Sequence, residues 1–142
     1  GNPWPTVVCE VARSQSLPHI LQKVNSFWLA PNRSEDVIML KLWSWNNRRD
    51  TNGRPLRRLT CYKFCRHASL QAGQTQGKFQ PVQMLKFGTI DRYDIPYNSC
   101  TAPGMCIVTI TPACVFEGCS KGTTESVTDY ADDNQLIVRL HP

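Results

Sequence analysis

Residues 37–66 read VIMLKLWSWNNRRDTNGRPLRRLTCYKFCR, and this stretch decides the fold. Its first part, Val37 to Trp45, is apolar on both faces, which is typical of a strand inside a sheet. Its last part, Leu59 to Arg66, alternates in polarity and is rich in aromatic residues, as in a half-buried strand. Asn52-Gly53 lies between them, and this pair favours a tight turn between antiparallel strands. The stretch therefore predicts a β-hairpin.

Further strands and one helix are predicted on either side of the hairpin. A helix is predicted at residues 17–29, because apolar residues recur there at helical spacing and Ser16 can cap its start. Residues 1–15 are expected to form an extended arm, and residues 68–80 and 117–134 exposed loops. Strands are predicted at Val82–Ile90, Met105–Thr111 and Leu136–Leu140, with Ala113–Phe116 as another candidate.

This pattern predicts a mainly β (α+β) fold. We expect a single disulfide-stapled β-barrel or sandwich with one short packed helix, spanning residues 1–142 as one domain. The 142 residues carry a formal net charge of +5 and a hydrophobic share of 41%, which suit one globular domain. The longest strongly apolar run, Val37–Leu40, is far shorter than the roughly 20 residues of a membrane span. The chain starts at Gly1 without an initiator Met, which we take as a mature or trimmed start.

Cysteine content favours a secreted, disulfide-bonded protein. The seven cysteines are Cys9, Cys61, Cys65, Cys100, Cys106, Cys114 and Cys119. They predict three disulfides and one unpaired thiol, with the pairing left open. Cys61 and Cys65 should not bond to each other, because four residues of extended strand separate their Cα atoms by about 13 Å. Cys9 is one possible partner for either, and turns could join Cys100 to Cys106 and Cys114 to Cys119.

Metal and cofactor sites are not expected. Cys61, Cys65 and His67 would share one strand face and could resemble zinc ligands, but a closed site needs a fourth donor. Glycine loops that cradle phosphate are absent from the sequence, so no cofactor is predicted. Asn32-Arg33-Ser34 is a sequon, which makes Asn32 a predicted glycosylation site.

The hairpin is strongly basic, and this is the most informative feature for function. Seven of the sixteen basic residues fall within it: Arg48, Arg49, Arg54, Arg57, Arg58, Lys63 and Arg66. Such a density on a projecting turn attracts sulfated glycans, acidic membrane surfaces, acidic protein surfaces or, less favoured, nucleic acid. Alternatively, these cations only keep the sheet soluble or pair with the acidic segment 117–133. Trp43 and Trp45 beside Lys41 are expected either in the core or as a ledge for a partner.

The function predicted from these features is binding outside the cell. We expect a secreted, effector-, ligand- or viral-ectodomain-like protein that contacts a host or receptor protein or an anionic surface through the basic hairpin. The alternative is a small secreted hydrolase with ribonuclease-like chemistry, in which His19, His67 or His141 would act with Lys41. A metal-stabilised nucleic-acid binder is a third class, which applies only if the cysteines are reduced. No spacing rule supports catalysis, so an enzyme is the less favoured prediction.

Overall fold

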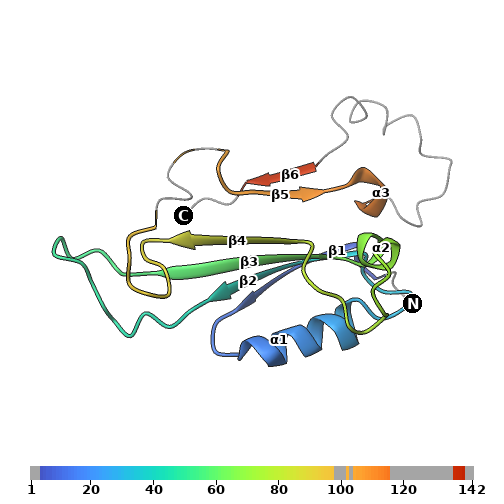
Figure 1. The fold of residues 1–142 in the computed structure, drawn as a ribbon, viewed down its shortest axis with the longest axis horizontal. Coiled ribbons are helices and arrows are strands. Elements are labelled where there is room, and N and C mark those ends of the chain that lie inside the picture. The colour runs from blue at the N-terminus through green and yellow to red at the C-terminus, as the bar shows by residue number, and fades with distance from the viewer. Residues whose placement is uncertain (1–3, 98–101, 103, 116–135, 140–142) are drawn as a thin grey trace.

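A four-stranded mixed sheet forms the centre of this small α+β protein (Figure 1). The computed structural model describes residues 4–97, 102, 104–115 and 136–139. Along the chain the elements are β1 (Val7–Ala12), α1 (Leu17–Lys23), η1 (Val24–Trp28), β2 (Asp36–Leu42), β3 (Arg58–Cys65), α2 (Arg66–Gln71), β4 (Gln83–Gly88), β5 (Ile107–Ile110), α3 (Pro112–Val115) and β6 (Leu136–Arg139).

The strands of the main sheet follow the order β1-β2-β3-β4. β1 and β2 are parallel, because α1 and η1 carry the chain back along the sheet between them. β2 and β3 are antiparallel and pair Leu40 with Cys61 and Asp36 with Cys65, which confirms the predicted hairpin. β4 pairs antiparallel with β3, while β5 and β6 form a separate two-stranded sheet. The predicted arm at residues 1–15 therefore contains an edge strand, β1.

Each face of the main sheet packs against a different layer. Phe64 of β3 points to one face and packs in a cluster with Ile20 of α1. Cys61 of β3 points to the opposite face, because side chains alternate along a strand, and packs in a cluster with Val108 of β5. In Figure 1, α1 accordingly lies below the sheet and β5 lies above it.

The main sheet is not closed into a barrel, so this part of the fold prediction is wrong. Within the described residues β1 and β4 are its two edges and do not pair with each other. Four strands are too few for closure, since even small barrels use about five to eight. The helical layer and the β5–β6 layer bury the two faces instead.

The helix predicted at residues 17–29 is confirmed as α1 and η1. The Ser16 hydroxyl accepts a hydrogen bond from the backbone N–H of His19 at 3.4 Å, and Pro18 lies in the first turn. Ile20 and Val24 are 0% exposed and form the buried stripe. The spacing of the apolar residues and the Ser16 cap, both local features of the sequence, thus determine where this helix begins and which side is buried.

Two other segments are helical where the sequence predicts a loop or a strand. α2 occupies the start of the predicted loop at residues 68–80: the Cys65 thiol accepts the N–H of Ala68 at 3.4 Å, and Gly73 with φ 78° follows its end. α3 stands where the strand Ala113–Phe116 was expected, because Pro112 favours a first helical turn.

The C-terminal part of the chain contains the predicted acidic loop and the last predicted strand. The predicted loop at 117–134, with its acidic residues, lies outside the described residues. The strand predicted at Leu136–Leu140 is observed as β6, over Leu136–Arg139. Of the helices in the described part of the chain, none is long and apolar enough to cross a membrane.

Candidate functional site

The segment between β2 and β3 projects beyond the end of the sheet (Figure 1). Asp50 organises its tip, because its Oδ1 accepts the backbone N–H groups of Asn52 and Arg54, each at 2.8 Å. Gly53 has a φ of 77°, a left-handed conformation that glycine adopts without strain. The turn predicted from Asn52-Gly53 is therefore present.

Three of the predicted binding residues come together at the root of this hairpin. Arg54, Arg57 and Arg58 line one open cavity of about 1190 Å³, and Arg13 from the segment after β1 lines it too. Trp43, Trp45 and Phe87 supply aromatic surface in the same cavity. Charge and aromatic faces thus occupy one surface that only the folded hairpin creates.

Arg48 and Arg49 are held by contacts within the hairpin and with a neighbouring loop. The Arg48 guanidinium donates to both carboxylate oxygens of Asp94, at 2.8 and 3.0 Å, and so lowers the pKa of that carboxyl. Arg49 donates to the carbonyl of Gly53 and lies 5.5 Å from the Trp45 ring centroid. These two residues shape the hairpin.

Lys63 and Arg66 do not belong to the exposed surface, which corrects the prediction for both. Lys63 is 5% exposed and lies 3.4 Å from Oδ1 of Asp36. Arg66 forms an ion pair with Glu35 and also donates to the carbonyl of Ala30. Both lie toward the end of β3 that is far from the hairpin tip, where they neutralise buried carboxylates.

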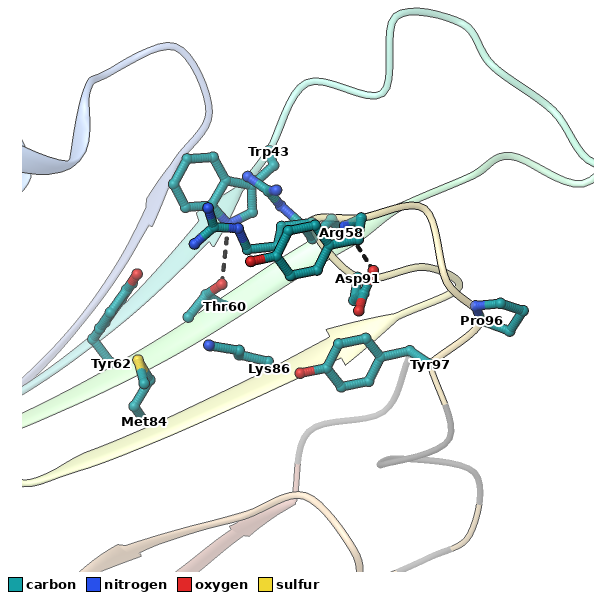
Figure 2. A pocket seen from close by; sticks show the side chains of 11 residues that line it. Trp43, Arg58, Thr60, Tyr62, Met84, Lys86, Asp91, Pro96 and Tyr97 are labelled. Atoms are coloured by element: carbon teal, nitrogen blue, oxygen red, sulfur yellow. Dashed lines mark hydrogen bonds between the residues drawn. The ribbon is translucent and has the colours of Figure 1, made fainter.

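A second cavity, which the sequence does not predict, lies on the face of the main sheet that also packs against α1. It measures about 1070 Å³ and is lined by Trp43, Arg58, Thr60, Tyr62, Met84, Lys86, Asp91, Arg92, Tyr93, Pro96 and Tyr97 (Figure 2). The strands supply six of these residues or their neighbours: Trp43 directly follows β2, β3 contributes Arg58, Thr60 and Tyr62, and β4 contributes Met84 and Lys86. Its charged residues are three cations and one carboxylate, so the cavity is basic.

Trp43 and Arg58 line both cavities, whose other lining residues lie on opposite faces of the sheet: Tyr62 packs on the α1 side, and Leu59 and Phe87 pack on the β5 side. The Arg58 guanidinium lies 4.1 Å from the Trp43 ring centroid, and Trp43 Nε1 donates to Thr60 Oγ1 at 3.0 Å (Figure 2). A guanidinium stacked on an indole face is held in place while its edge stays available for hydrogen bonds.

The loop after β4 forms the far wall of the second cavity. Asp91 Oδ1 accepts the N–H groups of Tyr93 and Ile95, at 2.7 and 3.0 Å, which turns the chain sharply. Arg92 lies 4.8 Å from the Tyr93 ring centroid, and Tyr93 is 69% exposed. An aspartate followed by alternating charged and aromatic residues is the local signal that could have pointed to this wall.

The residues of the predicted hydrolase are not assembled among the described residues. Lys41 is 5% exposed, and its Nζ donates to the carbonyls of Arg13 and Gln15 at 2.8 and 2.6 Å. His19 and His67 are exposed on different helices and line neither of the two cavities described above, while His141 lies outside the described residues.

The cysteines differ from the expectation of three disulfides. Cys9, Cys61, Cys65 and Cys114 are free thiols, and no disulfide joins two of the described residues. Cys106 is disulfide-bonded, and Cys100 and Cys119 lie outside the described residues. Cys61 and Cys65 lie on one strand and are not bonded to each other, as the spacing predicts.

The predicted glycosylation site, and the residues weighed as zinc ligands, can be placed in the structure. Asn32 of the sequon is exposed and has a φ of 61°, while Ser34 is fully buried. Asp36, Cys65 and Cys114 are buried, with potential metal-ligating atoms within 4.8 Å of one another. His67 is not part of this cluster, so the zinc grouping considered from the sequence is not formed.

Comparison with known proteins gives no relative. The chain matches no protein-family model, and neither a curated protein nor a solved structure is significantly similar to it.

Proposed function

We propose that this protein is an extracellular binding protein that captures an acidic partner on the surface around the root of the β2–β3 hairpin, where the two cavities share Trp43 and Arg58. We call it the basic-aromatic surface, and it comprises Trp43, Arg54, Arg57, Arg58, Lys86, Arg92 and Tyr93. The observation that carries the proposal is the Arg58–Trp43 stack, since this cation and this aromatic ring lie at the edge that both cavities share, between the hairpin arginines and the groove on the sheet.

The chemistry of this surface fits anionic groups carried on a partner with apolar or ring surfaces. Arg54 and Arg57 are exposed, so their charges attract an acidic partner over several ångströms and accelerate encounter. Tyr93 is largely exposed and adds an aromatic face that a sugar ring or an apolar side chain can cover. An acidic glycan or an acidic protein segment offers both groups.

A binding titration with two probes tests the proposal. A sulfated heparin-derived hexasaccharide and a glutamate-rich peptide are titrated at about 50 and about 150 mM salt, where exposed charges are screened beyond about 14 and 8 Å. Arg57→Ser should weaken binding of an accepted probe by about fivefold. Lys78→Ser is the matched control, because Lys78 is also an exposed cation but lines neither cavity. Absence of binding to both probes, or equal losses in both variants, would refute the proposal.

The aromatic contribution is tested separately. Tyr93→Ser should leave the fold unchanged, because the side chain is 69% exposed, and should still weaken binding. Unchanged binding would mean that charge alone attracts the probe and that the groove on the sheet is not part of the site.

The extracellular location rests on the cysteine content and on the exposed sequon. A domain of 142 residues with seven cysteines is typical of an oxidising compartment. Expression through a secretory pathway followed by treatment with an N-glycosidase checks the sequon: a mass loss that Asn32→Gln abolishes supports Asn32 as the glycosylated residue.

The hydrolase is the second candidate, and only the basic surface supports it. RNA degradation that survives in the double variant His19→Ala/His67→Ala would exclude the predicted histidine chemistry on these two residues.

A further inference from the structure

Two buried thiols from distant parts of the chain face each other behind the main sheet. Sγ of Cys65 and Sγ of Cys114 are 3.6 Å apart, and the residues are 49 positions apart in sequence. Both residues are 3% exposed. Cys65 ends β3 and caps α2, while Cys114 belongs to α3, so their contact is where the β5–α3 layer meets the main sheet.

We propose that Cys65 and Cys114 are joined by a disulfide in the mature protein, and that this bond fastens the β5–α3 layer to the sheet. A disulfide brings two sulfurs to about 2.05 Å, so the sulfurs need to approach by about 1.5 Å. Small side-chain rotations at two neighbouring buried residues supply such a shift. The bond removes two S–H groups from an apolar cluster and adds no charge.

The bond forms by thiol–disulfide exchange with an external disulfide such as glutathione disulfide. One protein thiolate attacks a glutathione sulfur, a mixed disulfide forms, and one glutathione thiolate leaves. The second protein thiolate then attacks the protein sulfur of the mixed disulfide and releases the second glutathione. Two protein thiols are thereby oxidised, one glutathione disulfide is reduced to two thiols, and the two protons pass to glutathione.

The exchange belongs to folding, before the two layers have closed. Burial raises the pKa of Cys65 to about 12, so the folded protein holds almost none of this residue as thiolate. An unfolded cysteine ionises far more readily and is accessible to glutathione. The same burial protects the finished disulfide from reductants, because an attacking thiolate must reach a sulfur that is closed off from solvent.

A metal ion is the competing occupant of this cluster, and the surroundings favour the disulfide. Two thiolates on one zinc ion lie about 3.8 Å apart, so the sulfur separation alone fits both cases. However, Asp36 already pairs with Lys63, whose ammonium lies 3.4 Å from Oδ1 and would repel a dication. Asp36, Cys65 and Cys114 also supply only three donors, and the described residues add no fourth to the group.

Peptide mapping of the oxidatively folded full chain tests the pairing. Free thiols are alkylated under denaturing, non-reducing conditions before digestion with trypsin. Cleavage after Lys63 and Arg66 releases Cys65 on the tripeptide 64–66, whereas Cys61 is released on the separate peptide 59–63. We expect the tripeptide 64–66 linked to the peptide 93–121, which contains Cys114. An alkylated Cys65, or a link from Cys65 to the peptide with Cys61 or with Cys9, would overturn the proposal.

Variants and a native mass measurement complete the test. Cys114→Ser should abolish the link to the tripeptide 64–66, and Cys61→Ser should retain it, since Cys61 is an equally buried thiol on the same strand. If the link survives in Cys114→Ser, another cysteine of peptide 93–121 is the partner and the proposed pair is wrong. The wild-type map stands even where a variant fails to fold. Native mass spectrometry that finds one bound zinc and a mass loss of only about 2 Da, which the disulfide of Cys106 accounts for, would identify a metal site instead.

Discussion

Loss of one partner from the buried Asp36–Lys63 ion pair should destabilise the fold by roughly 3–5 kcal/mol. The side chains of Lys63 and Asp36 are 6% and 0% exposed, and Nζ lies 3.4 Å from Oδ1. At an effective dielectric constant of about 20, charges at that separation attract by about 5 kcal/mol. Lys63→Met leaves an uncompensated carboxylate between β2 and the β5–α3 layer, and Asp36→Asn leaves an uncompensated ammonium.

A double-mutant cycle measures this coupling. Urea unfolding of the wild type, Lys63→Met, Asp36→Asn and the double variant is followed by tryptophan fluorescence, under reducing conditions in all four. The double variant should be more stable than the sum of the two single losses implies, by at least about 2 kcal/mol. The exposed pair Arg48–Asp94 is the matched control, and its cycle should show little coupling. Additive single losses, or single losses below about 1 kcal/mol, would refute the view that the pair is desolvated.

Two further predictions concern the hairpin root and the buried thiols. Gly88→Ala should destabilise the protein by roughly 3 kcal/mol or more, because Gly88 has a φ of 122° and a Cβ there would overlap the backbone carbonyl of Arg57. Gly53→Ala is the control in urea melts: its Cβ would meet no atom within 4 Å, so only the left-handed backbone cost of about 1 kcal/mol applies, and equal losses would contradict the close approach at Gly88. The reduced protein should lose stability as the pH rises from about 9 toward 11, because burial raises the pKa of Cys61 to about 11 and the unfolded chain therefore ionises this thiol first. Urea melts across that range should show a shallower decline for Cys61→Ala, and an unchanged slope would show that the Cys61 thiol is already solvated in the fold.

Local sequence patterns predict the strands and α1 because local physics determines them. The double-faced apolar run of β2 and the capped stripe of α1 match the burial that the structure shows, whereas β3, whose sequence alternates in polarity, is buried on both faces from Thr60 to Cys65. α2 was missed since its cap is a thiol, and the segment that follows is polar enough to resemble a loop. Closure into a barrel depends on pairing between strands far apart in the sequence, which no local pattern specifies.

The candidate site could be predicted only in part, because charge density along a sequence does not say where each side chain points. Lys63 is basic like Arg58, but an odd-numbered position on β3 turns it toward the β5–α3 layer and Asp36. Arg66 forms an ion pair with Glu35, because the pairing of Asp36 with Cys65 places these two neighbouring residues side by side. The second cavity depends on β4 lying next to β3 and on the turn at Asp91, so it emerges only from tertiary structure.

β3 connects the proposed binding surface with the proposed disulfide, and its length separates their tests. Arg58 begins the strand and Cys65 ends it, so seven residue steps of about 3.3 Å place them roughly 23 Å apart. Substitutions more than about 10 Å apart with no shared partner usually act additively. A Cys114→Ser variant that folds should therefore keep its affinity for an anionic probe, and Arg57→Ser should keep the disulfide map. If loss of the bridge also abolishes binding, the β5–α3 layer supports the sheet along its whole length and the two sites form one cooperative unit.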